Sequence, residues 1–512
     1  MTLAPSRAWW ESPWLLLTLV LASALPLLWP EVPPLVDVPG HMGRYKVQID
    51  LEHSAELQRF YRFEWALIGN LGVDLLAVPL SKLMGLEAAV KLVALMIPPL
   101  TVAGFLWVAR EVHGRVPPTA LFAVPLAYNF PFHYGFINFT LAMALAFLAF
   151  GLWLRLARLG RFGLRAALFV PISMVLWVAH AYGWATLSIL AFSAELVRQH
   201  DKGHNYFRAA WHSGVHCLAL APPVLLMLLW RSGDVAGATT GWFKMKWKAN
   251  WLIMALRDRW RWFDLVSVAL VAAVPAAALA TRKLGYSRNL IASALLLALA
   301  FLLLPRKLIG SFYADMRIVP YMLATAVLAV RLREGAGPRL AAGIAAAGLL
   351  FVAVRTGATA ASLWLYDREY DRHVTAIDLL PRGARLLSTV GRTCKDSWTM
   401  SRLQHLPALA IVRKEAFSND QWITAGAQLL SVHYPEGGFF VQDPTQLVTA
   451  TRCRGKDWLT LNETLSEFPR GGFDYVWLID PPAHDARLLA GYKPIWRSGS
   501  SVLYKASAKS GP

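Results

Sequence analysis

Charged side chains are scarce in this chain. Asp, Glu, Lys and Arg make up only 16% of the 512 residues, whereas an average soluble domain carries roughly 25%. Hydrophobic residues make up 56% of the chain. They gather in nearly charge-free runs of about 17 to 22 residues, the length that crosses roughly 30 Å of hydrocarbon. This composition excludes an ordinary soluble domain and predicts a polytopic α-helical membrane protein.

Motifs of several enzyme and binding classes are also missing. The sequence contains no HExxH, no phosphate-binding loop motif and no serine or cysteine hydrolase arrangement. The net charge is +19, but no RNA-binding or zinc-finger motif accompanies it. Lys and Arg also gather in the cytoplasmic loops of membrane proteins. We therefore expect membrane lipids as partners and no nucleic acid.

Cysteine is nearly absent. Of the three cysteines, Cys217 lies in an apolar segment, while Cys394 and Cys453 lie in the polar C-terminal part. The latter two lack the CxxC spacing of a metal site. If the C-terminal part lies outside the cytoplasm, a disulfide between Cys394 and Cys453 is plausible.

Eleven apolar runs are clear, and one further run, 65–84, is ambiguous because it holds Asp74 and Lys82. If the amino terminus is cytoplasmic and 65–84 does not span, five loops rich in Lys or Arg all face the cytoplasm, as the positive-inside rule requires. We therefore predict about eleven transmembrane helices in an inner (cytoplasmic) membrane, with 31–87 as the first outer loop. The eleven runs are 13–30, 88–109, 118–133, 138–154, 166–181, 183–197, 212–230, 263–281, 288–305, 317–332 and 338–358.

The composition changes near residue 360. The predicted domains are a transmembrane domain over 1–360 and a small extracytoplasmic α/β domain over 361–512. In the second domain, FDYVWLID (473–480) has the pattern of a buried strand, and PPAHDARLLAGY and SVLYKA follow it. This order predicts strand, helix, strand.

The first outer loop carries the densest group of polar residues. Asp37, His41, Arg44 and Lys46 follow the first apolar run within ten residues. Spacing of four residues places Asp37 and His41 near one face of a short helix. Asp37 can act as a general base on an acceptor hydroxyl, or it can bind a divalent cation such as Mg²⁺ or Mn²⁺. Arg44 and Lys46 would balance phosphate charge. The alternative is an interfacial helix with solvated charges.

Other predicted outward loops offer further candidates for binding substrate or lipid phosphate. Each kind of residue also has a structural explanation. The aromatic residues are typical of a membrane-interface belt, the histidines of helix–helix packing, and the cations of side chains that extend to the lipid headgroups. An Asp315–Arg317 structural pair is a further alternative to phosphate binding by Arg317. The candidates are His133, His180, Tyr182, Lys246, Arg259, Tyr313, Asp315 and Arg317.

Two segments resemble the glycosyltransferase C superfamily, whose members include protein O-mannosyltransferase and aminoarabinose transferase relatives. These segments are LVDVPGHMGRY (35–45) and GLEAAVKLVALMIPPLTVAGFLWVAREVHGR (85–115). Asp37 stands at the position of the family's first-loop acid. Many relatives have adjacent acids there and another acid in the second outer loop, where this chain has His133. The resemblance implies a polyprenyl-phosphate-sugar donor and an extracytoplasmic α/β domain.

These patterns lead to one functional hypothesis with two alternatives. The hypothesis is transfer of a sugar from a polyprenyl-phosphate carrier to a glycan, lipid or protein acceptor on the extracytoplasmic face, with inversion. Asp37 is the base, with His41 beside it, and Arg44, Arg317 and the basic stretch 244–261 neutralise the carrier phosphate. The alternatives are a transporter or flippase of a charged lipid-linked substrate, and a non-catalytic membrane assembly protein.

Overall fold

A computed structural model describes residues 8–229, 238–395, 397–423 and 428–507. The chain forms two compact units, which are treated separately below. The helical unit contains Met1–Trp29, Leu67–Leu75 and Leu92–Ser362, and the mixed unit contains Pro30–Ala66, Leu76–Lys91 and Leu363–Pro512. The sequence interpretation assigned 31–87 to the membrane domain, whereas the contacts group most of this segment with the C-terminal part.

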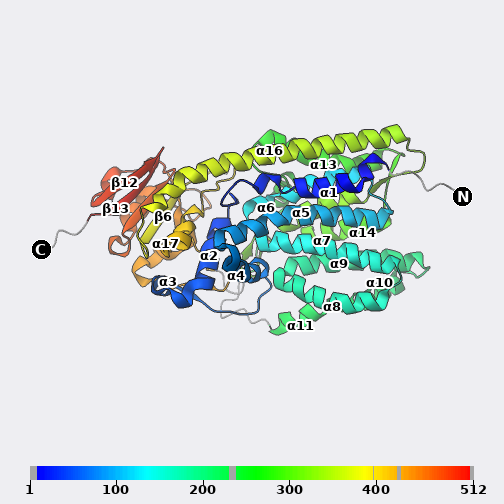
Figure 1. Cartoon of the computed structure of the whole chain (residues 1–512), viewed down its shortest axis with the longest axis horizontal. Helices are drawn as coiled ribbons and strands as arrows, with labels where there is room; N and C mark the ends of the chain where they lie inside the picture. Colours follow the sequence, from blue (N-terminus) through cyan, green and yellow to red (C-terminus); the bar gives the residue numbers. More distant parts are fainter. Residues whose placement is uncertain (1–7, 230–237, 396, 424–427, 508–512) are drawn as a thin grey trace. The chain divides into compact units, whose positions relative to one another are not determined.

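Long apolar helices build the helical unit. Helices α7, α8 and α9 run side by side, and α10 packs against α9 (Figure 1). The longer helices are α1 (Pro13–Ala22), α5 (Leu86–His113), α7 (Ile137–Arg158), α8 (Phe162–Ala179), α9 (Ala181–Asp201), α10 (Tyr206–Cys217), α11 (Pro222–Leu229), α12 (Met245–Ile253), α13 (Arg261–Ala280), α14 (Arg288–Leu303), α15 (Val319–Leu328) and α16 (Pro338–Asp378). Two small antiparallel sheets pair β2 (Leu284–Tyr286) with β5 (Val330–Leu332) and β3 (Lys307–Leu308) with β4 (Ser311–Phe312).

Five helices in the described part of the chain are long and apolar enough to cross a membrane, namely α5, α7, α8, α13 and α16. A sixth span results if the bent pair Tyr206–Leu220 and Pro222–Leu228 counts as one. The prediction of a multi-pass membrane protein is confirmed, but a count of about eleven spans is not.

The run 118–133 shows one reason for the difference. It forms a 3₁₀-helix, η4 (Pro118–Tyr128), and a short α-helix, α6 (Phe130–Tyr134). Pro125 lies inside η4, where its missing N–H removes one helical hydrogen bond, whereas Pro118 and Pro131 lie in the first turns of η4 and α6. The ambiguous run 65–84 contains α4 (Gly72–Met84), a helix of 13 residues. At 1.5 Å per residue it spans about 20 Å, which is too short to cross the bilayer.

A seven-stranded mixed sheet forms the core of the mixed unit. The strand order is β10-β9-β6-β11-β13-β12. Strand β9 pairs with the carboxyl-terminal end of β6, and β7 pairs with the amino-terminal end of β6. The strands are β6 (Arg385–Gly391), β7 (Phe417–Ser418), β9 (Leu447–Thr449), β10 (Leu459–Thr460), β11 (Tyr475–Ile479), β12 (Tyr492–Ser498) and β13 (Ser501–Ala506). The helices of this unit are α2 (Val38–Asp50), α3 (Ala55–Phe60), α17 (Leu409–Lys414) and α18 (Leu461–Glu467). The first loop adds β1 (Tyr61–Phe63), which pairs antiparallel with β8 (Leu430–Val432).

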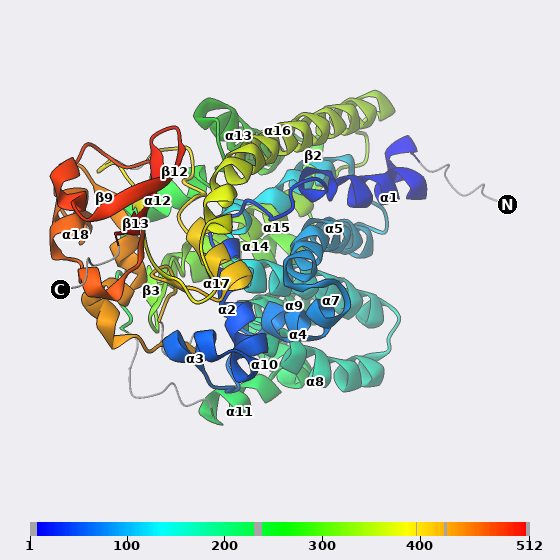
Figure 2. The same cartoon turned by 60° about the vertical axis from the view of Figure 1, so that its left-hand side comes forward.

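The expected strand, helix, strand order at the C-terminal end is only partly correct. Strand β11 is buried along its whole length, as predicted. The expected helix is wrong: Pro481 and Pro482 follow the strand, and only a 3₁₀ turn forms at Ala486–Leu489. The chain then continues as the antiparallel hairpin β12–β13, which is visible at the C-terminal end in Figures 1 and 2.

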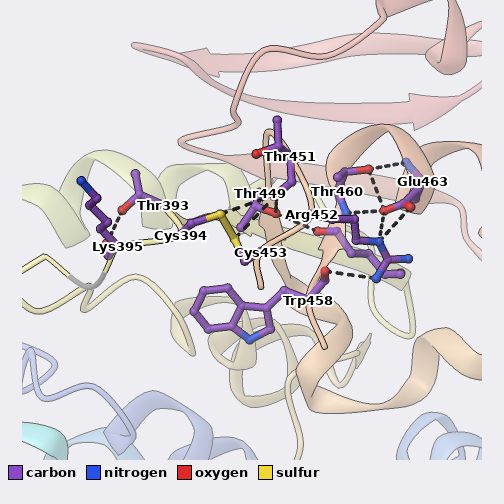
Figure 3. Close-up of a disulfide and its surroundings, with 11 residues drawn as sticks. Thr393, Cys394, Lys395, Thr449, Thr451, Arg452, Cys453, Trp458, Thr460 and Glu463 are labelled. Carbon is purple, nitrogen blue, oxygen red and sulfur yellow. Dashed lines mark hydrogen bonds and ion pairs between the residues drawn. A yellow bond between two sulfur atoms is a disulfide. The ribbon is translucent and has the colours of Figure 1, made fainter. Parts of the chain in front are cut away.

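A disulfide joins Cys394 to Cys453 (Figure 3). Cys394 follows β6 and Cys453 follows β9, and these two strands are parallel neighbours. Their carboxyl ends therefore lie together, and the two Cα atoms are 5.3 Å apart. The bridge closes a loop of 59 residues beside the edge of the sheet.

Helix α2 packs through two glycines. A Cβ atom added at Gly40 would lie 2.7 Å from the Trp422 ring, and one at Gly43 would lie 2.9 Å from the side-chain amide of Gln421. Because glycine has no Cβ atom, α2 can pack directly against the segment 405–422 at these two positions.

We expect Gly40→Ala to destabilise the protein by about 1–3 kcal/mol, because the new methyl group overlaps the Trp422 ring. The control is Gly163→Ala in α8, where nothing lies within 4 Å of the added Cβ. This exposed helical site should gain roughly 0.5–1 kcal/mol. Thermal unfolding of the purified variants in detergent measures both changes. Equal stability of the two variants would contradict the packing described for α2.

Candidate functional site

The Asp37 carboxylate is buried at the start of α2. Asp37 is the N-cap residue of this helix, and Pro39 occupies one of its first two positions. The residue is 5% exposed. Its Oδ1 atom lies 3.8 Å from Nε2 of His405. The sequence therefore identified an acid that the fold buries next to an imidazole from the C-terminal part of the chain.

His405 lies between two carboxylates. Its other ring nitrogen, Nδ1, is 3.8 Å from Oδ1 of Asp443 and 3.2 Å from the backbone carbonyl of Asp420. The Trp422 ring stacks on the imidazole with 4.5 Å between ring centres. We call Asp37, His405 and Asp443 the acid–imidazole row. The tryptophan stack and the carbonyl fix the orientation of its central ring.

Burial shifts the protonation of this row. It lowers the pKa of His405 to about 4, so the imidazole is neutral at pH 7. It raises the pKa of Asp443 to about 7, although a hydrogen bond from Gln446 opposes this shift. Burial, followed by the charge of Asp443, also raises the pKa of Asp420 well above its usual range. Such shifts are common where side chains exchange protons during a reaction.

We expect Asp443→Asn to change the pH dependence of stability. The pKa of the Asp443 carboxyl is about 7 in the folded protein, against a usual value of 3.8. Between these values the unfolded chain releases the proton and the folded chain keeps it, so this group makes the protein less stable as pH rises. The variant should therefore match the wild type near pH 4 and exceed it near pH 8, as measured by unfolding across pH. The control is Asp485→Asn, because Arg487 lowers the pKa of Asp485 to about 2, and its loss should act in the opposite direction.

The other first-loop candidates lie on the same helix. His41 stacks between Tyr45 and Trp422, and burial together with the charge of Arg44 lowers its pKa well below the usual value. Arg44 is buried, with its guanidinium carbon 5.0 Å from the centre of the Tyr45 ring. Lys46 contacts two carboxylates, those of Asp50 at 2.5 Å and Glu415 at 3.3 Å. These two ion pairs hold Lys46 within the mixed unit.

In the helical unit, two predicted residues, His180 and Tyr182, lie beside a third, Arg317. Arg317 donates from Nη1 to Nε2 of His180 at 3.1 Å and from Nη2 to the Ser311 hydroxyl at 3.2 Å. Its guanidinium also lies 4.3 Å from the Phe136 ring centre and 5.7 Å from that of Tyr182. Tyr182 is anchored by a hydrogen bond to the carbonyl of Ala314. An oriented guanidinium among aromatic rings is suited to bind a phosphate.

Asp315 binds a lysine of the basic stretch 244–261 that was not singled out by number as a site residue. Lys248, in α12, is 2% exposed and contacts Oδ2 of Asp315 at 3.2 Å. It also donates to the carbonyls of Phe301 and Leu304. Lys246, the residue selected from the sequence, is exposed on the other side of the same helix. The spacing of Lys248 and Trp251, three residues apart and both buried, marks the inward face of α12.

The remaining predicted residues have separate surroundings in the helical unit. His133 is fully buried, and its Nδ1 lies 4.0 Å from Oδ1 of Asp258. Tyr313 lies among aromatic rings, 5.6 Å from Trp251 and 5.7 Å from Tyr134. Arg259 is half-buried. Residues 230–237, which precede the basic stretch 244–261 in the chain, lie outside the described residues.

Comparisons with known proteins give one informative likeness. No family model matches this sequence, and no curated protein matches it. The fold is similar to the crystal structure of ArnT from Cupriavidus metallidurans, which was solved with bound undecaprenyl phosphate. The match covers 99% of this chain and 100% of that one, with a TM-score of 0.50 and 13% identity. The chain therefore shares the overall fold of that ArnT structure. The resemblance inferred from the first loop is therefore confirmed at the level of the fold.

Among the residues that the structure describes, the surroundings of Asp37 do not fit a metal ion. Among the described residues, no group of three or more His, Cys, Asp or Glu side chains is arranged to hold a metal ion. Asp37 and Asp443 face opposite nitrogens of the same imidazole, so their carboxylates cannot converge on one cation. We therefore derive no step through Mg²⁺ or Mn²⁺.

Sequence reasoning missed His405 and Asp443, and it included Lys248 only as one member of the basic stretch 244–261. His405 and Asp443 lie more than 360 residues from Asp37 in the chain, and neither belongs to a recognisable motif. The usable signals were local: QHLP (404–407) and QDP (442–444) each place a polar residue just before a proline-started turn. Those signals indicate turns, but they do not indicate that the two turns meet.

Proposed function

We propose that this protein transfers a sugar from a polyprenyl-phosphate carrier to an acceptor on the extracytoplasmic face of a cell's inner membrane. The observation that carries the proposal is the likeness to ArnT along nearly the whole chain, because that protein was crystallised with undecaprenyl phosphate. The apolar helices support a lipid substrate reached from within the membrane. The identities of the sugar and of the acceptor are open.

Asp37 is the proposed general base. Its buried carboxylate takes the proton of the acceptor hydroxyl while the acceptor oxygen bonds to the anomeric carbon. The bond from that carbon to the phosphate oxygen breaks, and its electron pair leaves with the carrier phosphate. A single displacement of this kind inverts the configuration. We assign one acid, Asp37, to the reaction. A single acid favours direct displacement over a path with a covalent glycosyl-enzyme intermediate.

Arg317 is the proposed ligand of the carrier phosphate. Hydrogen bonds to His180 and Ser311 fix its guanidinium, and aromatic rings lie beside it. A guanidinium held in advance stabilises the charge that develops on the leaving phosphate without reorganising. Lys248 is paired with Asp315 and two carbonyls, so we assign it to holding the loop before α15.

The test uses the full-length protein in lipid nanodiscs with radiolabelled undecaprenyl-phosphate sugars and a membrane extract as the source of acceptor. We expect one of these donors to be consumed, with free undecaprenyl phosphate released and the label moved to an acceptor. Absence of both binding and consumption across a panel of hexose, pentose and amino-sugar donors would refute the proposal.

The same donors separate the transporter alternative when the protein is placed in sealed liposomes. A flippase leaves the lipid-linked sugar intact and moves it between leaflets, which an impermeant periodate reagent detects. Retention of the intact donor with a change of leaflet would replace the transferase proposal by the transporter.

A further inference from the structure

A small sheet of the helical unit follows α14 in the chain. Strands β3 and β4 form its antiparallel pair. The segment 238–241 lies along β3, because Thr240 and Lys307 exchange two backbone hydrogen bonds of 3.0 Å. We call residues 238–245 and 306–313 together the loop sheet. All of them belong to the helical unit, so their arrangement does not depend on the mixed unit.

The turn of the loop sheet contains a residue that its backbone conformation disfavours. Ile309 and Gly310 connect β3 to β4, and both have positive φ, of 47° and 79°. Two-residue turns with positive φ at both positions favour Asn, Asp and Gly, and a β-branched residue there is an outlier. Ile309 is also 44% exposed. Incomplete burial within the protein does not offset the strain, which indicates an apolar contact outside the fold.

Other apolar side chains of the loop sheet are exposed as well. Phe312 is 57% exposed and Phe243, another residue with positive φ, is 60% exposed. Trp242 beside it is half-exposed. Neighbouring residues of a strand point to opposite faces. Phe312 therefore points outward while Ser311, the residue before it, contacts Arg317.

The charged residues of the loop sheet are all positive. Lys244 and Lys246 are exposed, Lys307 is half-buried, and all three are interspersed with the apolar residues. The sequence has no Asp or Glu within 238–257 or 304–314. Aromatic and aliphatic side chains mixed with lysines match the interface of an anionic bilayer, where hydrocarbon meets lipid phosphate. An acidic protein surface would match the lysines but not the apolar side chains.

We propose that the loop sheet docks on the headgroup layer of an anionic membrane. Ile309 and Phe312 reach the acyl chains, and Lys244, Lys246 and Lys307 contact lipid phosphates. This contact goes beyond the proposed function, because it requires neither a sugar donor nor a transfer reaction. It assigns Lys246 to the bulk lipid rather than to the carrier phosphate.

This docking also fixes the position of the strand that binds Arg317. The Ser311 hydroxyl accepts a hydrogen bond from Nη2 of Arg317 at 3.2 Å, and the backbone carbonyl of Phe312 lies 3.5 Å from the same nitrogen. With the turn held at the headgroups, the guanidinium stays at one depth relative to the lipid phosphates.

The experiment places a fluorescent NBD probe at the turn of the full-length protein in lipid nanodiscs. Ile309→Cys is made together with Cys217→Ser, and Cys394 and Cys453 are bonded to each other, so position 309 carries the label. Nitroxide lipids quench a probe in the bilayer, and iodide quenches a probe in water. In discs of phosphatidylglycerol we expect the probe to lie about 5–10 Å into the boundary between headgroups and acyl chains, the depth of interfacial segments.

The control probe is placed by Glu334→Cys, also with Cys217→Ser. Glu334 is an exposed residue of the turn between β5 and α16 in the same unit. Iodide should quench this probe and nitroxide lipids should not. Replacing phosphatidylglycerol by phosphatidylcholine should move the 309 probe toward water, because the attraction between lysine and anionic lipid is lost. Lys244→Gln combined with Lys307→Gln should have the same effect in phosphatidylglycerol, seen as a red shift and weaker quenching by nitroxide lipids.

Three results overturn the inference. The first is equal quenching by iodide at positions 309 and 334. The second is protection of the 309 probe from iodide without quenching by nitroxide lipids, which indicates a contact with protein. The third is an equal depth of the 309 probe in phosphatidylcholine and phosphatidylglycerol, which shows that lipid charge has no part in the contact. A failure of sugar transfer changes none of these readouts, so it refutes the proposed function alone.

Discussion

Asp37→Asn is expected to abolish sugar transfer while leaving the protein folded. The amide has nearly the shape of the carboxylate but cannot take the acceptor proton, so we expect a loss of about 10²- to 10⁴-fold in rate, the usual contribution of a general base. Binding of undecaprenyl phosphate should persist, because the base does not hold the carrier. Donor consumption and carrier binding, measured on the same nanodisc preparation, test both parts.

The matched control for this prediction is Asp50→Asn on the same helix. Asp50 pairs with Lys46 and has a half-exposed side chain. Surface ion pairs of this kind contribute about 0–1 kcal/mol, so the control should retain activity and stability. Full activity of Asp37→Asn would remove the base from the mechanism, whereas loss of carrier binding together with activity would indicate a ligand role for Asp37.

Arg355→Met is expected to destabilise the helical unit strongly. Arg355, in α16, donates from Nη1 to Oδ1 of Asp264 in α13 at 2.6 Å, and both residues are buried. Removing the arginine leaves a buried carboxylate without this cation, a change that typically costs about 3–5 kcal/mol. Unfolding of purified protein in mixed detergent micelles, followed by tryptophan fluorescence, measures the loss.

A double variant shows how much of this loss comes from the carboxylate that remains. Arg355→Met combined with Asp264→Leu removes both charges, and such replacements are often neutral or stabilising. We expect it to be more stable than Arg355→Met alone. The control for the missing arginine side chain is Arg368→Met on the same helix, an exposed site that should change stability by less than about 0.5 kcal/mol. A double variant less stable than Arg355→Met would show that the ion pair is not the source of the loss.

The sequence predicted the parts of the fold that depend on local patterns. Long charge-free runs give helices, as in α7 and α13, and α13 remains helical although Pro275 lies inside it. The run 118–133 is also apolar, but it forms the 3₁₀-helix η4 and the short α-helix α6, a difference that hydropathy alone does not register. The buried strand β11 was readable for the same local reason, since all its residues are apolar or aromatic.

In the candidate site, too, only the residues marked by a local sequence pattern could be predicted. Asp37 stood out because an acid follows an apolar run, and Arg317 and His180 stood out because they lie at the ends of others. Their partners depend on how distant segments pack, which one sequence does not reveal. Lys248 illustrates the limit: three lysines alternate in 244–248, and only the burial of one helix face shows which of them turns inward.

The pairing of β1 with β8 has a consequence for how the protein is made. Tyr61 lies opposite Val432, so the first loop and the tail are built into one unit although more than 360 residues separate them. Asp37 is synthesised long before His405. Contacts between residues so distant in the sequence form late in folding. Until the tail has been synthesised and folded, the nascent chain holds its acid without the imidazole beside it. Premature termination anywhere before residue 405 therefore yields a chain in which Asp37 has no imidazole beside it.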